Sequence, residues 1–264
     1  MTTTRKSRTN GVERAFQIIE CLVELGEAST AYHIAKTVGA PLSTVYDIIG
    51  QLEKMDVLRR TGNDGKFFLG SRLLMYGLAY TGFLVEDDVY RLAADELCRR
   101  SGENVHVCIR DGDCMVVAAM AEAGQHFYIT SRPGSRSPLN WSASGRLLIG
   151  HLTPEQRSEI FSRAKPSPNG RAVTDPEVLE RECREAWEHG YCIQTGASGF
   201  SVACIAAGVI NNRGECCATM SLVVPESVAD VRQKELVDMA LNSVRDIERQ
   251  LGYQHRKTPG ADVA

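Results

Sequence analysis

Apolar residues recur at helical spacing three times within the first 55 residues of the chain. Thr30 is placed to cap a short second helix that ends at Gly39, and Pro41 opens a third. The first helix would carry an apolar stripe of Val12, Ala15, Phe16, Ile19, Leu22 and Val23. The inner face of the third would carry Val45, Ile48, Ile49, Leu52 and Met55.

A hairpin pattern follows the third helix. Residues 57–60 and 66–69 are predicted strands, and the turn-forming cluster 61–65 lies between them. Three helices and a hairpin in this order predict a winged helix-turn-helix. The short break at 38–41 sets the third helix at a steep angle to the second, which leaves its outer face free to enter a DNA major groove.

The outer face of the third helix and the basic residues around it are the candidate DNA contacts. Small hydroxyls and a tyrosine suit phosphate and base-edge contacts, whereas an N-terminal arm and the wing supply the cations. The alternative is a small helical subdomain with no nucleic-acid role. The candidates are Ser43, Thr44, Tyr46 and Asp47 of the helix, Arg59, Arg60 and Lys66 of the wing, and Arg5 and Arg8 of the arm.

Length, charge and cysteine content narrow the class of protein. A chain of 264 residues favours two domains, and 30 basic against 33 acidic residues exclude a uniformly basic coat protein. Nine cysteines with no CxxC pair argue for free thiols in a reducing cytoplasm. No signal peptide or membrane-spanning run is recognised, so we expect no membrane association. We also expect no metal, because His106 and His126 have no partner at ligand spacing, and no other cofactor.

Residues 71–85 are rich in apolar side chains and poor in charge, which predicts a linker helix. We expect it to pack against a second copy of the chain, and the alternative is that it packs back on its own wing.

The second half is predicted to be an α+β domain, because strands follow one another with short turns and helices lie at the ends. Two Pro-containing caps, at 153–156 and 174–177, begin helices. The predicted helices also include 87–101, 142–151 and 228–251, and the predicted strands are 104–110, 114–121, 126–131, 191–194, 202–210 and 216–224.

Seven short segments together resemble the IclR family of bacterial transcription regulators over residues 10–251. They are 12–15 (VERA), 41–46 (PLSTVY), 68–74 (FLGSRLL), 102–106 (GENVH), 174–176 (TDP), 189–191 (HGY) and 204–207 (CIAA). The resemblance implies a winged helix-turn-helix, a linker helix, and a GAF-like α/β effector domain with an antiparallel sheet. It also implies a homodimer or a dimer of dimers on a double-stranded DNA operator, with a small organic or aromatic acid as effector of a catabolic operon.

The resemblance also implies which residues of this chain would contact the effector. The family usually has basic residues where Leu42 and Asp47 stand, so base recognition would shift toward the remaining helix residues and the wing. Gln194 and Val223 replace more polar pocket residues, which favours a ligand with an apolar body. The expected contacts are Trp141, Ala143, Ser144, Gly145, Gln194, Cys204, Ser221 and Phe127.

The start of the helix at 142–151 explains why an acid is expected, because free backbone N–H groups there favour an anion. Two alternatives remain. One is an enzyme built on Cys204 with His106 or His126 as base, and the other is a ligand-free interaction module on DNA. His106 and His126 otherwise count as structural or surface residues.

The expected organisation has five parts. They are a basic flexible arm over 1–10, a DNA-binding domain over 11–70, a linker helix over 71–85, an effector domain over 86–253 and a disordered tail over 254–264.

Overall fold

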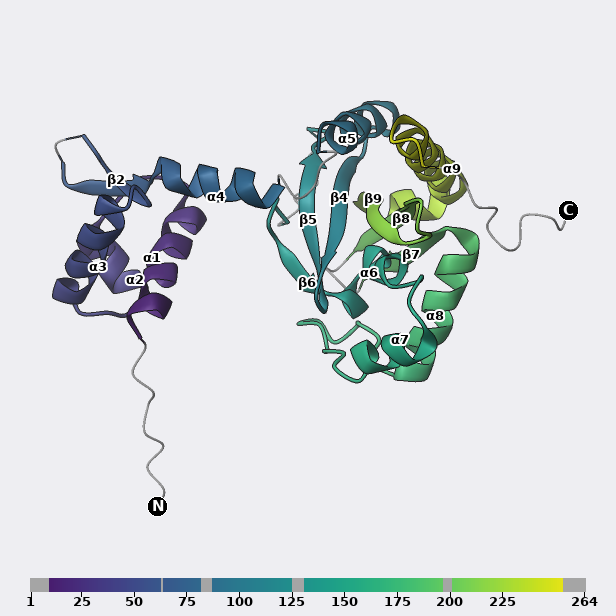
Figure 1. Cartoon of the computed structure of the whole chain (residues 1–264), viewed down its shortest axis with the longest axis horizontal. Helices are drawn as coiled ribbons and strands as arrows, with labels where there is room; N and C mark the ends of the chain where they lie inside the picture. The colour runs from purple at the N-terminus through teal and green to yellow at the C-terminus, as the bar shows by residue number, and fades with distance from the viewer. Residues whose placement is uncertain (1–9, 63, 82–86, 125–130, 197–200, 254–264) are drawn as a thin grey trace, which may run out of the picture. The chain divides into compact units, whose positions relative to one another are not determined.

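The computed structural model of the protein describes residues 10–62, 64–81, 87–124, 131–196 and 201–253 (Figure 1). The chain divides into two compact units, residues 1–85 and 86–264, and each is described by itself. The fold is mixed α+β, as the sequence predicts.

The first unit is a winged helix-turn-helix. A three-stranded antiparallel sheet of order β1-β3-β2 accompanies its helices. Its elements are α1 (Gly11–Leu25), β1 (Ser29–Thr30), α2 (Ala31–Thr37), α3 (Leu42–Lys54), β2 (Leu58–Thr61), β3 (Lys66–Leu69) and α4 (Ser71–Thr81). The two-residue strand β1 was not expected, since it is too short to leave a periodic signal.

Local chemistry sets the predicted turns of this unit. The Thr30 side chain accepts a hydrogen bond from the His33 amide and caps α2 as expected. Gly39 has a φ of 63°, which explains a glycine in the tight turn before α3. At Gly70 an added Cβ would lie 2.1 Å from the carbonyl oxygen of Asp56, so only glycine fits between the wing and α4.

The predicted apolar stripe of α1 is wrong at three positions. Val12, Phe16 and Val23 are exposed, whereas Ile18 and Cys21 are buried with Leu22 in the core. The helix carries apolar residues on two faces, and only the packing of the neighbouring elements decides which face is covered. Met55 was also misplaced, because it follows the last turn of α3 and is 53% exposed.

Helix α4 is covered only in part by its own unit. Its first turn packs back on the wing unit, where Leu73 joins the core and the Arg72 amide donates to the Asp56 carbonyl. Leu74, Met75 and Tyr76 are exposed. The side chain of Leu78 lies outside the described set.

The second unit is built on a six-stranded antiparallel sheet of order β6-β5-β4-β9-β8-β7 within the described residues. The strands are β4 (Asn104–Asp111), β5 (Cys114–Ala121), β6 (Arg136–Pro138), β7 (Tyr191–Thr195), β8 (Val202–Ile210) and β9 (Cys216–Pro225). The helices are α5 (Asp87–Ser101), η1 (Leu139–Trp141), α6 (Ala143–Leu148), α7 (Pro154–Phe161), α8 (Pro176–His189) and α9 (Glu226–Gln250).

The sheet has helices on both faces (Figure 1). Ala143 and Leu147 of α6 pack with Cys204, Ala206 and Val223, and this side is called the α6 face below. Helices α5 and α9 contact the strands from the opposite face. The ordinary alternation of side chains along each strand therefore fixes which residues lie under α6.

Most predicted elements of this unit lie where expected, with two differences. Helix α6 ends at Leu148 and not at 151, and β6 forms in a segment for which no element was predicted. The predicted cap at 174–177 is made by Asp175, whose carboxylate accepts from the amides of Glu177 and Val178. The predicted strand 126–131 lies outside the described residues except for Ser131.

Candidate functional site

The outer face of α3 is open, as a DNA-reading helix requires. Ser43, Thr44 and Asp47 are exposed, and the Tyr46 side chain is 53% exposed. Val45, Ile49 and Leu52 hold the opposite face in the core. The polar residues are thus presented together by a helix that is fixed from behind.

The basic residues of the wing divide between its two faces. Arg59 is paired with Phe68 and Lys66 with Thr61, so these two cations share one face. Arg60 lies on the other face, with its guanidinium 5.0 Å from the ring centre of Phe67 and 3.4 Å from the carboxylate of Glu53. The candidate contacts Arg5 and Arg8 lie outside the described residues.

Strand register brings three of the predicted effector residues to the α6 face. Gln194 is paired with Cys204, and Cys204 with Val223. Ser221 lies two residues before Val223, so its side chain is on the same face. Ser221 and Cys204 are buried, with 3% and 9% exposure, whereas Gln194 is half-buried at the edge strand.

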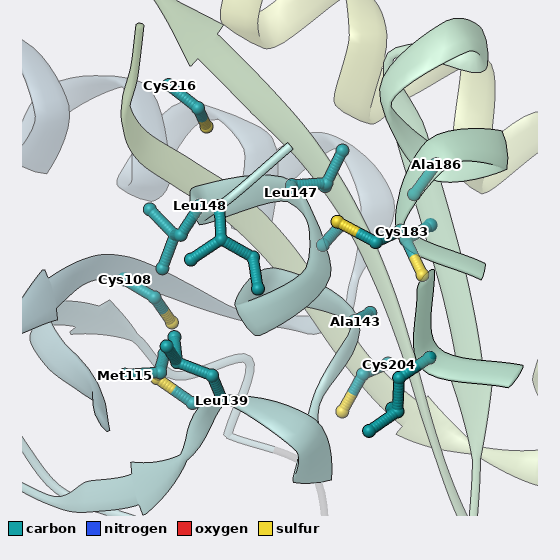
Figure 2. Close-up of a cluster of buried hydrophobic side chains, with 14 of the residues drawn as sticks. Cys108, Met115, Leu139, Ala143, Leu147, Leu148, Cys183, Ala186, Cys204 and Cys216 are labelled. Carbon is teal, nitrogen blue, oxygen red and sulfur yellow. The ribbon is translucent and has the colours of Figure 1, made fainter. Parts of the chain in front are cut away.

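The start of α6 differs from the prediction in one respect. The Gly145 amide is not free, because it donates to the Ser142 hydroxyl at 3.0 Å. Ala143 and Ser144 provide the first two amides of the helix, which have no acceptor within it. The hydroxyl of Thr219 donates to that of Ser144 at 2.8 Å and ties this end of α6 to β9. Figure 2 shows Ala143 and Cys204 near one another.

Two of the predicted effector contacts are aromatic, Trp141 and Phe127. The indole N–H of Trp141 donates to the Lys165 carbonyl at 2.8 Å, which orients the ring toward the segment between α7 and α8. Phe127 lies outside the described residues. A groove of about 380 Å³ reaches the edge of the α6 face, and Arg146, Glu182, Cys192 and Gln194 are among its lining residues.

His106 also lies on the α6 face, although the sequence suggested only a base in an enzyme, or a structural or surface residue. It is paired directly with Ser221 on one side and Met120 on the other. The side chain is 5% exposed, and its Nε2 atom has no hydrogen-bond partner among the described residues. Burial, and next the positive charge of Arg132, lower the pKa of His106 to about 4. Only strand register and burial distinguish His106 from an ordinary surface histidine. The sequence therefore held no signal that it lies in the candidate effector site.

Membrane-spanning helices and metal sites are both absent from the described parts of the chain. No helix there is long and apolar enough to cross a bilayer. No group of histidine, cysteine and acidic residues in those parts is arranged to hold a metal ion. All nine cysteines lie within the described ranges and are free thiols.

Two family profiles match the chain. The profile described as IclR helix-turn-helix domain matches residues 11–62, and the one described as bacterial transcriptional regulator IclR C-terminal matches residues 88–249. Curated relatives include the HTH-type transcriptional repressor AllR of Salmonella typhimurium, which is 26% identical over 260 residues that cover 95% of this chain and 93% of that protein. AllR of Escherichia coli K12 is 26% identical over 248 residues, covering 92% and 90% respectively.

Solved structures have the same fold over nearly the whole chain. IclR of Thermotoga maritima has a TM-score of 0.78 at 23% identity, covering 93% of this chain and all (100%) of that one. An IclR homolog of Microbacterium hydrocarbonoxydans, solved in complex with 4-hydroxybenzoate, has a TM-score of 0.75 at 25% identity, covering 92% and 99%.

The C-terminal profile alone spans more than half of the chain, and the relatives match it nearly end to end. The alternative of a cysteine-dependent enzyme is therefore wrong. The chain belongs to the IclR family of bacterial transcriptional regulators, and it is a ligand-responsive DNA-binding regulator and not an enzyme.

Proposed function

We propose that this regulator controls a catabolic operon in response to a small carboxylate that has an apolar or aromatic body. It would bind a double-stranded DNA operator as a homodimer or as a dimer of dimers. The observation that carries the effector proposal is the gathering of Gln194, Cys204 and Ser221 on the α6 face.

The chemistry of that face supports an effector with two different ends. The hydroxyl of Ser221 and the amide of Gln194 can make directional hydrogen bonds, and the first amides of α6 start above the same face. Cys204, Ala206 and Val223 offer apolar contact. The complex of the Microbacterium homolog with 4-hydroxybenzoate is a precedent for a ligand of this class in a protein of this fold.

The proposed response is a shift between two arrangements of the dimer. A ligand moves such an equilibrium only if it binds one arrangement more tightly than the other. A near-palindromic operator would match the two-fold symmetry of a dimer, with α3 of each copy in a major groove. Ser43, Thr44 and Tyr46 would contact base edges and phosphates, and Arg59, Arg60 and Lys66 the phosphates.

The test of the effector site is the Ser221→Ala variant, measured by calorimetry with benzoate and 4-hydroxybenzoate. Loss of one net hydrogen bond should cost about 1 kcal/mol of binding free energy, which is roughly a fivefold loss of affinity. Ser158→Ala on the exposed face of α7 is the matched control and should bind like the wild type. Unchanged affinity in Ser221→Ala would place the pocket elsewhere. An effector that proved to be a cation would overturn the proposed ligand class.

The third possibility, an interaction module that binds no small acid, makes the opposite prediction. No thermal shift with any organic or aromatic acid would support it, whereas stabilisation by an acid supports the effector proposal, because a ligand that binds only the folded state raises its stability.

A further inference from the structure

The α6 face holds a buried polar atom that has no hydrogen-bond partner among the residues that the structure describes. The Nε2 atom of His106 has none among the described residues, and the side chain is 5% exposed. Buried polar groups are nearly always paired in folded proteins, because an unpaired one loses its hydrogen bonds to water and gains none in return. The described residues therefore leave Nε2 available for a hydrogen bond to a bound ligand.

The position of His106 places it inside the proposed effector site. It lies on β4 and is paired with Ser221 on β9, so the two side chains are neighbours on one face of the sheet. Thr219 lies two residues before Ser221 on the same face, and its hydroxyl binds that of Ser144 at the start of α6. His106 therefore lies one row of the sheet beyond the contact that fixes the first turn of α6.

We propose that the imidazole of His106 donates a hydrogen bond from Nε2 to the carboxylate of the effector, beside the Ser221 hydroxyl. The inference rests on the effector site proposed above and adds the group that recognises the acid. A carboxylate only accepts hydrogen bonds, so it selects the neutral tautomer that carries its proton on Nε2.

Electrostatics favour an anion at this position. The positive charge of Arg132 acts on His106 in the same sense as burial and keeps the imidazole neutral at neutral pH. Among the directly paired neighbours, Ser221 and Met120 carry no charge. The same positive charge attracts a carboxylate bound next to His106 and repels a cation. The ligand class that fits is therefore a carboxylate whose body rests on the apolar part of the face.

The experiment compares two substitutions of His106 in the full-length protein. His106→Phe keeps the planar shape and removes both ring nitrogens. His106→Gln keeps an N–H donor close to the position of Nε2. Calorimetry with benzoate and 4-hydroxybenzoate should give a tenfold or greater loss of affinity for His106→Phe, because hydrogen bonds to charged groups are the stronger ones. His106→Gln should lose no more than about threefold, since it retains one neutral donor. Benzamide, which lacks the charge, should bind the wild type at least tenfold more weakly than benzoate.

Nitrogen NMR of the wild type gives a second readout that does not depend on how well a variant folds. The chain has six histidines, and the imidazole signals missing from the His106→Gln spectrum identify those of His106. Saturation with benzoate should shift the Nε2 resonance of His106. The imidazole should stay neutral, with its single proton on Nε2.

The outcomes separate this inference from the proposed function. In one outcome Ser221→Ala weakens benzoate binding, His106→Phe binds benzoate like the wild type, and the Nε2 signal does not move. This outcome would overturn the role of His106 and leave the effector site in place. Equal binding of benzamide and benzoate would overturn the carboxylate contact. Failure of both aromatic acids to bind the wild type would overturn the proposed aromatic class together with this inference.

Discussion

Burial decides the protonation state of the titratable side chains packed around α6. It raises the pKa of Cys108 and Cys183 to about 12, so both remain protonated thiols at neutral pH. The same desolvation lowers the pKa of His106 and keeps its imidazole neutral. Neutral donors are what a site for an acid needs, because they bind the anion without a second buried charge that must itself be paired.

His106 should also make the stability of the protein depend on pH. An unfolded chain protonates this histidine below about pH 6.5, whereas the folded protein does so only near pH 4. The unfolded state thus binds more protons between these values, and the free energy of unfolding should fall as the pH drops through that window, by on the order of 3 kcal/mol in full. Urea unfolding at pH 7 and pH 4.5 should show a smaller loss in His106→Gln than in the wild type. Equal losses would show that the imidazole is not buried as described.

At the scale of elements, α3 and the wing offer different kinds of DNA contact. Helix α3 presents exposed hydroxyls and Tyr46 but is cationic only at its end, at Lys54. The hairpin β2–β3 carries Arg59 and Lys66 on one face, with Arg60 on the other. Affinity for phosphate is therefore expected to come mainly from the wing, and sequence preference from the helix.

Changing Arg59 and Arg60 to Ala should weaken binding to every DNA sequence. Each lost phosphate contact reduces the slope of log K against log salt concentration by about 0.9, so the double variant should lose about twice that. Arg59→Ala alone is the cleaner single change, because Arg60 also contacts Phe67 and Glu53. Gel mobility shifts at several salt concentrations measure the slope.

Two comparisons make this test specific. Arg99→Ala removes the same charge from an exposed position in the second unit and should leave the slope unchanged. Thr44→Ala or Tyr46→Phe should instead change the preference among operator variants. If neither the wing nor the helix variants alter the mobility shift, the assignment of these contacts is wrong.

At the scale of the whole molecule, two compact units must be coupled if an effector is to control DNA binding. The exposed apolar side chains of α4, Leu74, Met75 and Tyr76, form a surface that a second copy would cover in the proposed dimer. Such a contact would join the DNA-binding units of two chains and explain why an apolar helix is left uncovered within one chain.

Leu74→Asp should therefore weaken the dimer and operator binding together, because a charge on this surface would have to lose its water on association. Light scattering at micromolar concentration measures the mass, and a mobility shift measures operator binding. Val231→Asp, at an 85% exposed position of α9, is the matched control. A monomeric wild type at that concentration would contradict the proposed assembly.

The sequence alone predicted most of the helices and strands. Caps such as Thr30 and the capping box at Thr153, and the apolar runs of β4, β8 and β9 between turn residues, mark where elements begin and end. These signals depend on neighbours three or four residues away, so they can be recognised without any tertiary contact. They predicted the winged helix-turn-helix and the α+β domain, and with the family resemblance they indicated the class of regulator.

Only the tertiary structure decided which faces are covered and which polar groups meet. The two apolar faces of α1 are equivalent in the sequence until α2 and α3 pack on the one that holds Ile18. His106 and Ser221 are 115 residues apart along the chain, and the pairing of β4 with β9 makes them neighbours. Burial and strand register are properties of the assembled sheet. For this reason the family resemblance suggested Ser221 as an effector contact, whereas nothing in the sequence suggested His106 beside it.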